Sequence, residues 1–98
     1  MNNKFTLNIE NGYTWEGKEY KEIIFDFEKL TGQDMIDIEK EMNDAGEFAL
    51  TAETSPNMCA RIAARAAGLP LDVITHLPLG HFSRARNAAR NFIMAVSE

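Results

Sequence analysis

The chain has 98 residues, of which 45% are hydrophobic and 26% are charged, and this composition is typical of one folded domain and excludes a wholly disordered chain. Its single cysteine excludes an intramolecular disulfide and a zinc site built from cysteines. No apolar run approaches the roughly 20 residues that cross a bilayer, and the first residues lack a signal-peptide pattern. We therefore expect a cytoplasmic protein with no membrane partner.

The charge is divided unevenly along the chain, whose formal net charge is −5 at pH 7. Residues 1–54 hold 13 acidic residues against five lysines, a balance of −8, whereas residues 55–98 hold two acidic residues against five arginines, a balance of +3. Halves of opposite charge can attract each other within one molecule or between copies. The net acidity argues against a general nucleic-acid binder.

Residues 1–28 are predicted to form a β-hairpin, because apolar and polar residues alternate along them. The residues expected to share the apolar face are Phe5, Leu7 and Ile9, then Ile23, Phe25 and Phe27. Glu16-Gly17-Lys18 is the expected reversal. Asn11-Gly12 is an equally good turn dipeptide, and it would mark either a bulge or the end of a separate first strand, giving three short strands. Since an isolated hairpin is marginal in water, its apolar face must pack on helices or on another copy.

Residues 31–45 are predicted to form the first helix, with Thr31 as N-cap and Asp34 three residues later. The apolar stripe of this helix consists of Met35, Ile38, Met42 and Ala45. Beside the stripe lies an acidic ridge, formed by Asp34, Asp37, Glu41 and Asp44. Residues 46–54 lose the helical period, which predicts a flexible loop.

A second helix is bracketed by Ser55-Pro56 at its start and Gly68 at its end. Its expected buried face consists of Cys59, Ile62, Ala63 and Ala66, and the residues expected opposite that face are Asn57, Arg61 and Arg65. Pro70 opens a short third helix that continues to about Leu77.

After Pro78, a long fourth helix is predicted from about Leu79 to Val96. Its apolar stripe is the widest in the sequence and consists of Leu79, Phe82, Ala85, Ala89, Phe92, Ile93 and Val96. We expect this helix to be the central element of the core, with Arg86 and Arg90 at the edge of the stripe. Residues 1–98 are thus predicted to form one α+β domain, an N-terminal hairpin packed on a bundle of about four helices in residues 31–45 and 55–96.

The Gly-Leu-Pro corner between the second and third helices resembles a helix-turn-helix at first sight. The stretch "PLDVITHL" has no arginine or lysine, however, and Asp72 would face the phosphates. A small DNA-binding regulator therefore stays only as an alternative, and no nucleic-acid partner is expected.

Metal binding and catalysis have little support in the sequence. Asp72 and His76 are spaced like ligands on one helix turn, but a third ligand is missing, since His81 lies beyond Pro78. No nucleophile has a base at a suitable spacing, and no glycine-rich phosphate loop is present. We expect no catalytic residue, no metal and no cofactor, hence no enzyme.

Two segments, taken in chain order, carry a resemblance to a known family. They are "WEGKEYKEIIFDFEKLTGQDMIDIEKEM" and "AARAAGLPLDVITHLPLGHFSRARNAARNFI". They resemble the tail assembly chaperones of long-tailed bacteriophages and prophages, in the group that includes Mu-like proteins. The residues that carry the resemblance are Gly17, Tyr20 to Phe27, Thr31, Gly32, Asp34, Ala67, Gly68, Leu69, Pro70, Val73, Ile74, Leu77 and Phe82. The resemblance covers about residues 13–95. These motifs are structural, and none is catalytic.

The resemblance implies a cytoplasmic, non-enzymatic factor that coats the tape measure protein until tail tube subunits polymerise around it. It also implies a homo-oligomer, such as a ring or spiral, and a longer frameshifted form of the chain as a further partner. A structural tail or head-completion component is an alternative.

Two groups of residues are then expected to meet partners. Met35, Met42, Trp15 and Tyr20 would receive the client, although an equally good interpretation places the large side chains in the core. Copies would join through the exposed hairpin edge or the alanine-rich helix faces. The second group would add charge pairs, with Asp34, Asp37 and Glu41 of one copy meeting Arg61 and Arg65, or Arg86 and Arg90, of the next.

Overall fold

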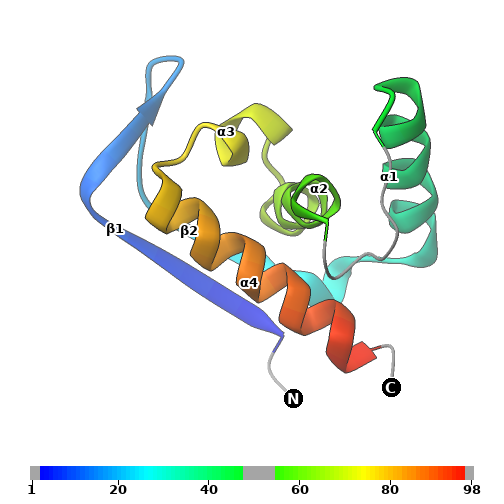
Figure 1. The fold of residues 1–98 in the computed structure, drawn as a ribbon. Helices are drawn as coiled ribbons and strands as arrows, with labels where there is room; N and C mark the ends of the chain where they lie inside the picture. The colour runs from blue at the N-terminus through cyan, green and yellow to red at the C-terminus, as the bar shows by residue number, and fades with distance from the viewer. Residues whose placement is uncertain (1–2, 48–54, 97–98) are drawn as a thin grey trace.

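An antiparallel hairpin packed against four α-helices makes up the part of the chain that the computed structural model describes, residues 3–47 and 55–96 (Figure 1). The elements are β1 (Lys4–Trp15), β2 (Lys18–Asp26), a 3₁₀ turn (Phe27–Lys29), α1 (Gly32–Asp44), α2 (Pro56–Ala67), α3 (Leu71–Thr75) and α4 (Leu79–Val96). The predicted α+β class is confirmed. Residues 48–54 of the predicted flexible loop lie outside the described residues.

The hairpin reverses at Glu16 and Gly17, between the paired residues Trp15 and Lys18. Both turn residues have positive φ, 49° and 82°, as a type I′ turn requires. The strand register shifts between Asn8 and Tyr13, where Gly12 has a φ of 77°. The second turn dipeptide therefore marks a bulge, and β1 continues through it as one strand.

One face of the hairpin packs on the helices, as the alternation predicted. Its buried residues are Leu7, Ile9, Ile23, Phe25 and Phe27. A row of stacked rings continues from this face into α4, with centroids 6.1 Å apart for Phe5 and Phe25, 6.2 Å for Phe25 and Phe27, and 5.2 Å for Phe27 and Phe92. This row joins the open end of the hairpin to the last turns of α4.

The turn end of the hairpin is joined to α3 by two contacts of β1. The Tyr13 hydroxyl donates a hydrogen bond of 2.9 Å to the Val73 carbonyl. The Trp15 ring stacks on His76, with centroids 4.2 Å apart. Burial of Tyr13, and then the nearby Tyr20, raise the pKa of the Tyr13 phenol.

Helix α2 lies at the centre of the fold, seen end-on in Figure 1 between α4 and α1. Its caps are those predicted, because Ser55 Oγ accepts from the Met58 N–H at 3.2 Å and Gly68 ends the helix at a φ of 69°. Its small side chains let neighbours approach on nearly every side, so the buried residues are Met58, Cys59, Ala60, Arg61, Ile62, Ala63, Ala64 and Ala66.

The prediction that α4 is the central element is therefore wrong. Only the middle of its apolar stripe is buried, at Ala85, Ala89 and Ile93. At the two ends of the helix, Leu79 is 78% exposed and Val96 is 61% exposed. The apolar stripe extends along α4 beyond the part that α2 and the hairpin cover. Apolar surface is therefore left uncovered at both ends of the helix.

Helix α1 lies at the periphery, on the far side of α2 from the hairpin (Figure 1). The Asp34 carboxylate accepts hydrogen bonds from the Thr31 N–H at 2.8 Å and the Thr31 hydroxyl at 3.2 Å, which confirms the predicted N-terminus. Ile38 and Met42 are buried. Ala45 is exposed, against the prediction, because the helix ends at Asp44 and Ala45 is its C-cap.

Candidate interaction surfaces

An arginine on α2 binds the acidic ridge of α1 within the same chain. The guanidinium of Arg65 lies 3.0 Å from an Asp34 oxygen, 2.7 Å from a Glu41 oxygen and 3.8 Å from an Asp37 oxygen. The Thr31 amide first, and then the Arg65 guanidinium, hold the pKa of Asp34 below its ordinary value. Glu41 first, and then Asp34, raise the pKa of Arg65.

A second arginine extends this arrangement toward the end of α1. Arg61 Nη2 lies 2.7 Å from a Glu47 oxygen, and Nη1 lies 3.8 Å from Glu41. The prediction that Arg61 faces away from the core is wrong, because the residue is only 8% exposed on a helix surrounded by neighbours. We call the six residues the Arg clasp: Asp34, Asp37, Glu41, Glu47, Arg61 and Arg65.

The Arg clasp realises, within one molecule, one of the two charge pairings that the sequence predicted. Three members of the acidic ridge are paired with α2 of their own chain, so the attraction between the acidic and basic halves acts within one molecule. Arg61 and Arg65 are occupied in this way. Of the other two arginines expected to join copies, Arg86 is half-buried and Arg90 is exposed, both on α4.

An apolar groove of about 310 Å³ lies between the first turns of α1 and the last turns of α4. We call it the α1–α4 groove, and it is lined by Leu30, Thr31, Gly32, Asp34, Met35, Ile38, Ile62, Phe92, Ile93 and Val96. Met35, expected to receive a client, lines this groove. Met42 does not, because it is buried in the core at 3% exposure.

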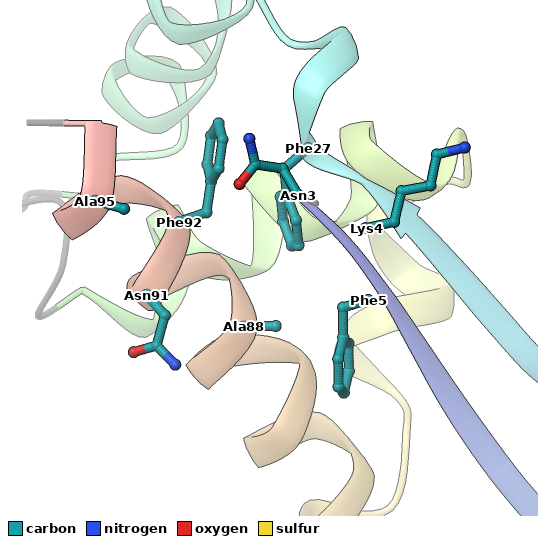
Figure 2. Close-up of a pocket in the computed structure, with 8 residues that line it drawn as sticks. All are labelled: Asn3, Lys4, Phe5, Phe27, Ala88, Asn91, Phe92 and Ala95. Carbon is teal, nitrogen blue, oxygen red and sulfur yellow. The ribbon is translucent and has the colours of Figure 1, made fainter. Parts of the chain in front are cut away.

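A second apolar hollow, of about 260 Å³, lies across Phe92 from the first. We call it the β1–α4 hollow, and it is lined by Asn3, Lys4, Phe5, Phe27, Ala88, Asn91, Phe92 and Ala95. Figure 2 shows the rings of Phe5 and Phe27 facing α4, while the Lys4 side chain extends away. Since Phe92 lines both spaces, its ring separates two adjacent apolar recesses at one end of the molecule.

The aromatic residues expected to receive a client lie elsewhere, near the hairpin turn. Trp15 is half-buried against His76, and Tyr20 is half-buried with its ring centroid 6.1 Å from that of Tyr13. The Lys18 ammonium lies 5.2 Å from the Tyr20 centroid, within cation–π range. These contacts place both rings in packing within the chain.

The two histidines also make contacts within the chain. His76 Nδ1 lies 2.9 Å from the Asp72 carbonyl oxygen, and His81 Nδ1 lies 2.7 Å from Arg84 Nη2. His81 and Arg84 line a polar hollow of about 600 Å³ beside the β1 bulge, together with Asn8, Ile9, Glu10, Asn11, Gly12 and Pro78. Across residues 3–47 and 55–96, no three histidine, cysteine, aspartate or glutamate side chains are placed to hold a metal ion.

Sequence reasoning missed two features of these surfaces. The first is the ion pair between Arg61 and Glu47, which lies after the end of α1, and the excess of acidic residues in residues 1–54 was the available signal. The second is the position of Phe92 and Val96, which were predicted as core residues but line the α1–α4 groove. The available signal was that α4 carries more apolar residues than one helix face can bury. Where along α4 the excess would lie depends on the neighbouring elements.

Comparison with models of protein families, with curated proteins and with solved structures gives no match to this chain. Among the helices that the structure describes, none combines the length and apolarity needed to cross a bilayer.

Proposed function

We propose that this chain is a non-enzymatic tail assembly chaperone of a long-tailed bacteriophage or prophage, acting in the cytoplasm of the host cell. Its client would be the tape measure protein, and its other partners would be copies of itself, with or without a longer frameshifted form. The observation that carries the proposal is the pair of adjacent apolar recesses on either side of Phe92. The resemblance to that family is the second support.

The two recesses suit an apolar helical stripe. Successive apolar side chains on one face of a helix lie three or four residues apart, roughly 4.5–6 Å along its axis. A helix laid across the end of α4 could place one such side chain in the α1–α4 groove and the next in the β1–α4 hollow, with the Phe92 ring between them. A long helical protein needs this cover because exposed apolar stripes aggregate.

The rim of this surface is also apolar. Val96 lines the groove and is 61% exposed. Side chains of this kind on a chain with a net charge of −5 favour an apolar partner over a polyanion such as DNA.

The DNA-binding alternative is disfavoured by α3, the helix that would enter the major groove. It spans five residues, Val73 and Ile74 are buried, and the Val73 carbonyl accepts the Tyr13 hydroxyl. The face that would read bases is thus packed into the core. A gel shift on random duplex DNA tests this alternative, and we expect no shift.

The first test is co-expression of the chain with the tape measure protein of the same genome. We expect the client to become soluble and light scattering to give a complex with several copies of the chain per client. A client that stays insoluble would contradict the proposal. Mass spectrometry of purified virions would then separate a chaperone, which is absent from the particle, from a structural tail or head-completion component, which is present.

A matched pair of variants on α4 tests the surface itself. Val96→Glu puts a charge on the rim of the α1–α4 groove, and we expect it to abolish solubilisation of the client because burying an unpaired carboxylate is strongly unfavourable. Met94→Glu is the control, since Met94 is similarly exposed but lines neither recess. Equal loss in both variants would contradict this placement of the client.

A further inference from the structure

The outer edge of β2 faces away from β1, the strand with which β2 pairs. The sheet has two strands within the described residues, so each strand is paired on one side only. In such a strand, every second residue points its N–H and C=O groups away from its neighbour. Near the hairpin turn, Lys18, Glu19, Lys21 and Glu22 are all exposed, and Tyr20 is half-buried. Figure 1 shows the turn end of the hairpin at the outer side of the molecule, away from α1.

We propose that β2 pairs antiparallel with β2 of a second copy, about a two-fold axis beside Tyr20, to form a continuous four-stranded sheet. The proposal rests on the self-association in the proposed function and names the surface that would carry it. It does not involve the recesses beside Phe92, so the client and the second copy would occupy separate surfaces.

Residues 18–22 read Lys-Glu-Tyr-Lys-Glu. When this segment lies antiparallel to the same segment of a second copy, each charge can face a charge of opposite sign. With the axis beside Tyr20, Lys18 lies opposite Glu22 of the second copy and Glu19 lies opposite Lys21. The two-fold symmetry repeats both pairs, which gives four cross-strand pairs of opposite charge and none of like charge. Opposite charges that face each other across strands are stabilising, and like charges are destabilising.

Neighbouring registers lose this complementarity. In a symmetric antiparallel pair, directly opposed residues have backbone groups of the same orientation, so the two-fold axis lies beside a residue and not between two residues. The neighbouring registers therefore move the axis by one whole residue. Moving the axis to Glu19 or Lys21 places two identical charges directly opposite each other, and moving it to Lys18 or Glu22 does the same. The sequence therefore selects one register at this edge.

The Lys18 and Glu22 pair is the better of the two for a test. The Glu19 carboxylate lies over the bulge, where a Cβ added at Gly12 would be 3.0 Å from Oε2, so changing Glu19 would also disturb β1. Lys18 and Glu22 are exposed, and Glu22 lies opposite Asn8 in the hairpin. Substitutions at these two positions leave the buried face of the sheet unchanged.

The experiment measures the dimer dissociation constant of the full chain by sedimentation equilibrium. We expect the wild type to dimerise. Lys18→Glu and Glu22→Lys, each alone, should weaken the dimer about tenfold or more, because each puts two like-charge pairs into it. Mixing the two single variants, or combining both changes in one chain, should restore wild-type affinity because every pair is then again of opposite charge.

Three results would overturn the proposal: a monomeric wild type, single variants that dimerise as well as the wild type, or weakened variants that neither mixing nor the double change restores. Circular dichroism confirms that each variant is folded before it is compared. Solubilisation of the tape measure protein by the same variants is measured separately. A wild-type chain that does not solubilise the tape measure protein would reject the chaperone function. A wild-type chain that solubilises it but does not dimerise would reject only this interface.

Discussion

At the scale of single residues, Asp34 has two roles in α1. Its carboxylate caps the helix at Thr31 and binds Arg65 of α2 at 3.0 Å. Asp37 lies 3.8 Å from the same guanidinium, with a side chain that is 44% exposed. We expect Asp34→Ala to lower the free energy of unfolding by about 1–2 kcal/mol and Asp37→Ala by less than about 0.5 kcal/mol. Urea denaturation at pH 7 measures both, and equal losses would contradict this division of roles.

The same carboxylate predicts how stability responds to acid. The Thr31 amide and the Arg65 guanidinium hold the pKa of Asp34 in the folded chain below the value of about 3.9 expected when unfolded. Its contribution is therefore fully present above that value and is lost as pH falls through the folded-state pKa. We expect the loss of stability between pH 5 and pH 3 to be smaller in Asp34→Asn than in the wild type. An unchanged loss, read from urea midpoints, would show that other carboxylates dominate.

At the scale of elements, α1 and α2 differ in how they are held. Helix α2 is buried on nearly all sides, whereas α1 buries only Ile38 and Met42 and is otherwise joined to α2 by the Arg clasp. Elements with few buried apolar side chains open at lower free energy. We expect amides of α1 to exchange hydrogen faster than those of α2, and Arg65→Gln to raise exchange further in α1 alone. Equal protection of the two helices would contradict this picture.

The elements also show what a sequence can and cannot predict. The Ser55 and Thr31 caps, the end of α2 at Gly68 and the turn at Gly17 were predicted, because each depends on chemistry within a few residues. The burial of Arg61 was not predicted. The sequence of α2 shows one apolar and one polar face, and it does not show that neighbouring elements also cover the polar face. Met35 and Met42 share the predicted apolar stripe, yet Met35 lines the α1–α4 groove whereas Met42 is buried in the core.

At the scale of the whole molecule, the uneven charge has two different consequences. The acidic ridge and the arginines of α2 neutralise each other across α1 and α2, and Arg61 within this contact is buried. The alternating charges of residues 18–22 are exposed at the far side of the fold, at the proposed interface between copies. Buried or partly buried pairs are screened by salt much less than exposed pairs.

Raising the salt concentration should therefore separate folding from assembly. Between low salt and about 1 M NaCl, where the screening length falls to ~3 Å, we expect dimerisation to weaken severalfold because its four charge pairs are exposed. The urea midpoint of the monomer should change little, because the Arg clasp is partly buried and the core is apolar. Sedimentation and urea denaturation in the same two buffers measure both. Dimerisation that is insensitive to salt would show that apolar contacts, and not the charges of β2, join the copies.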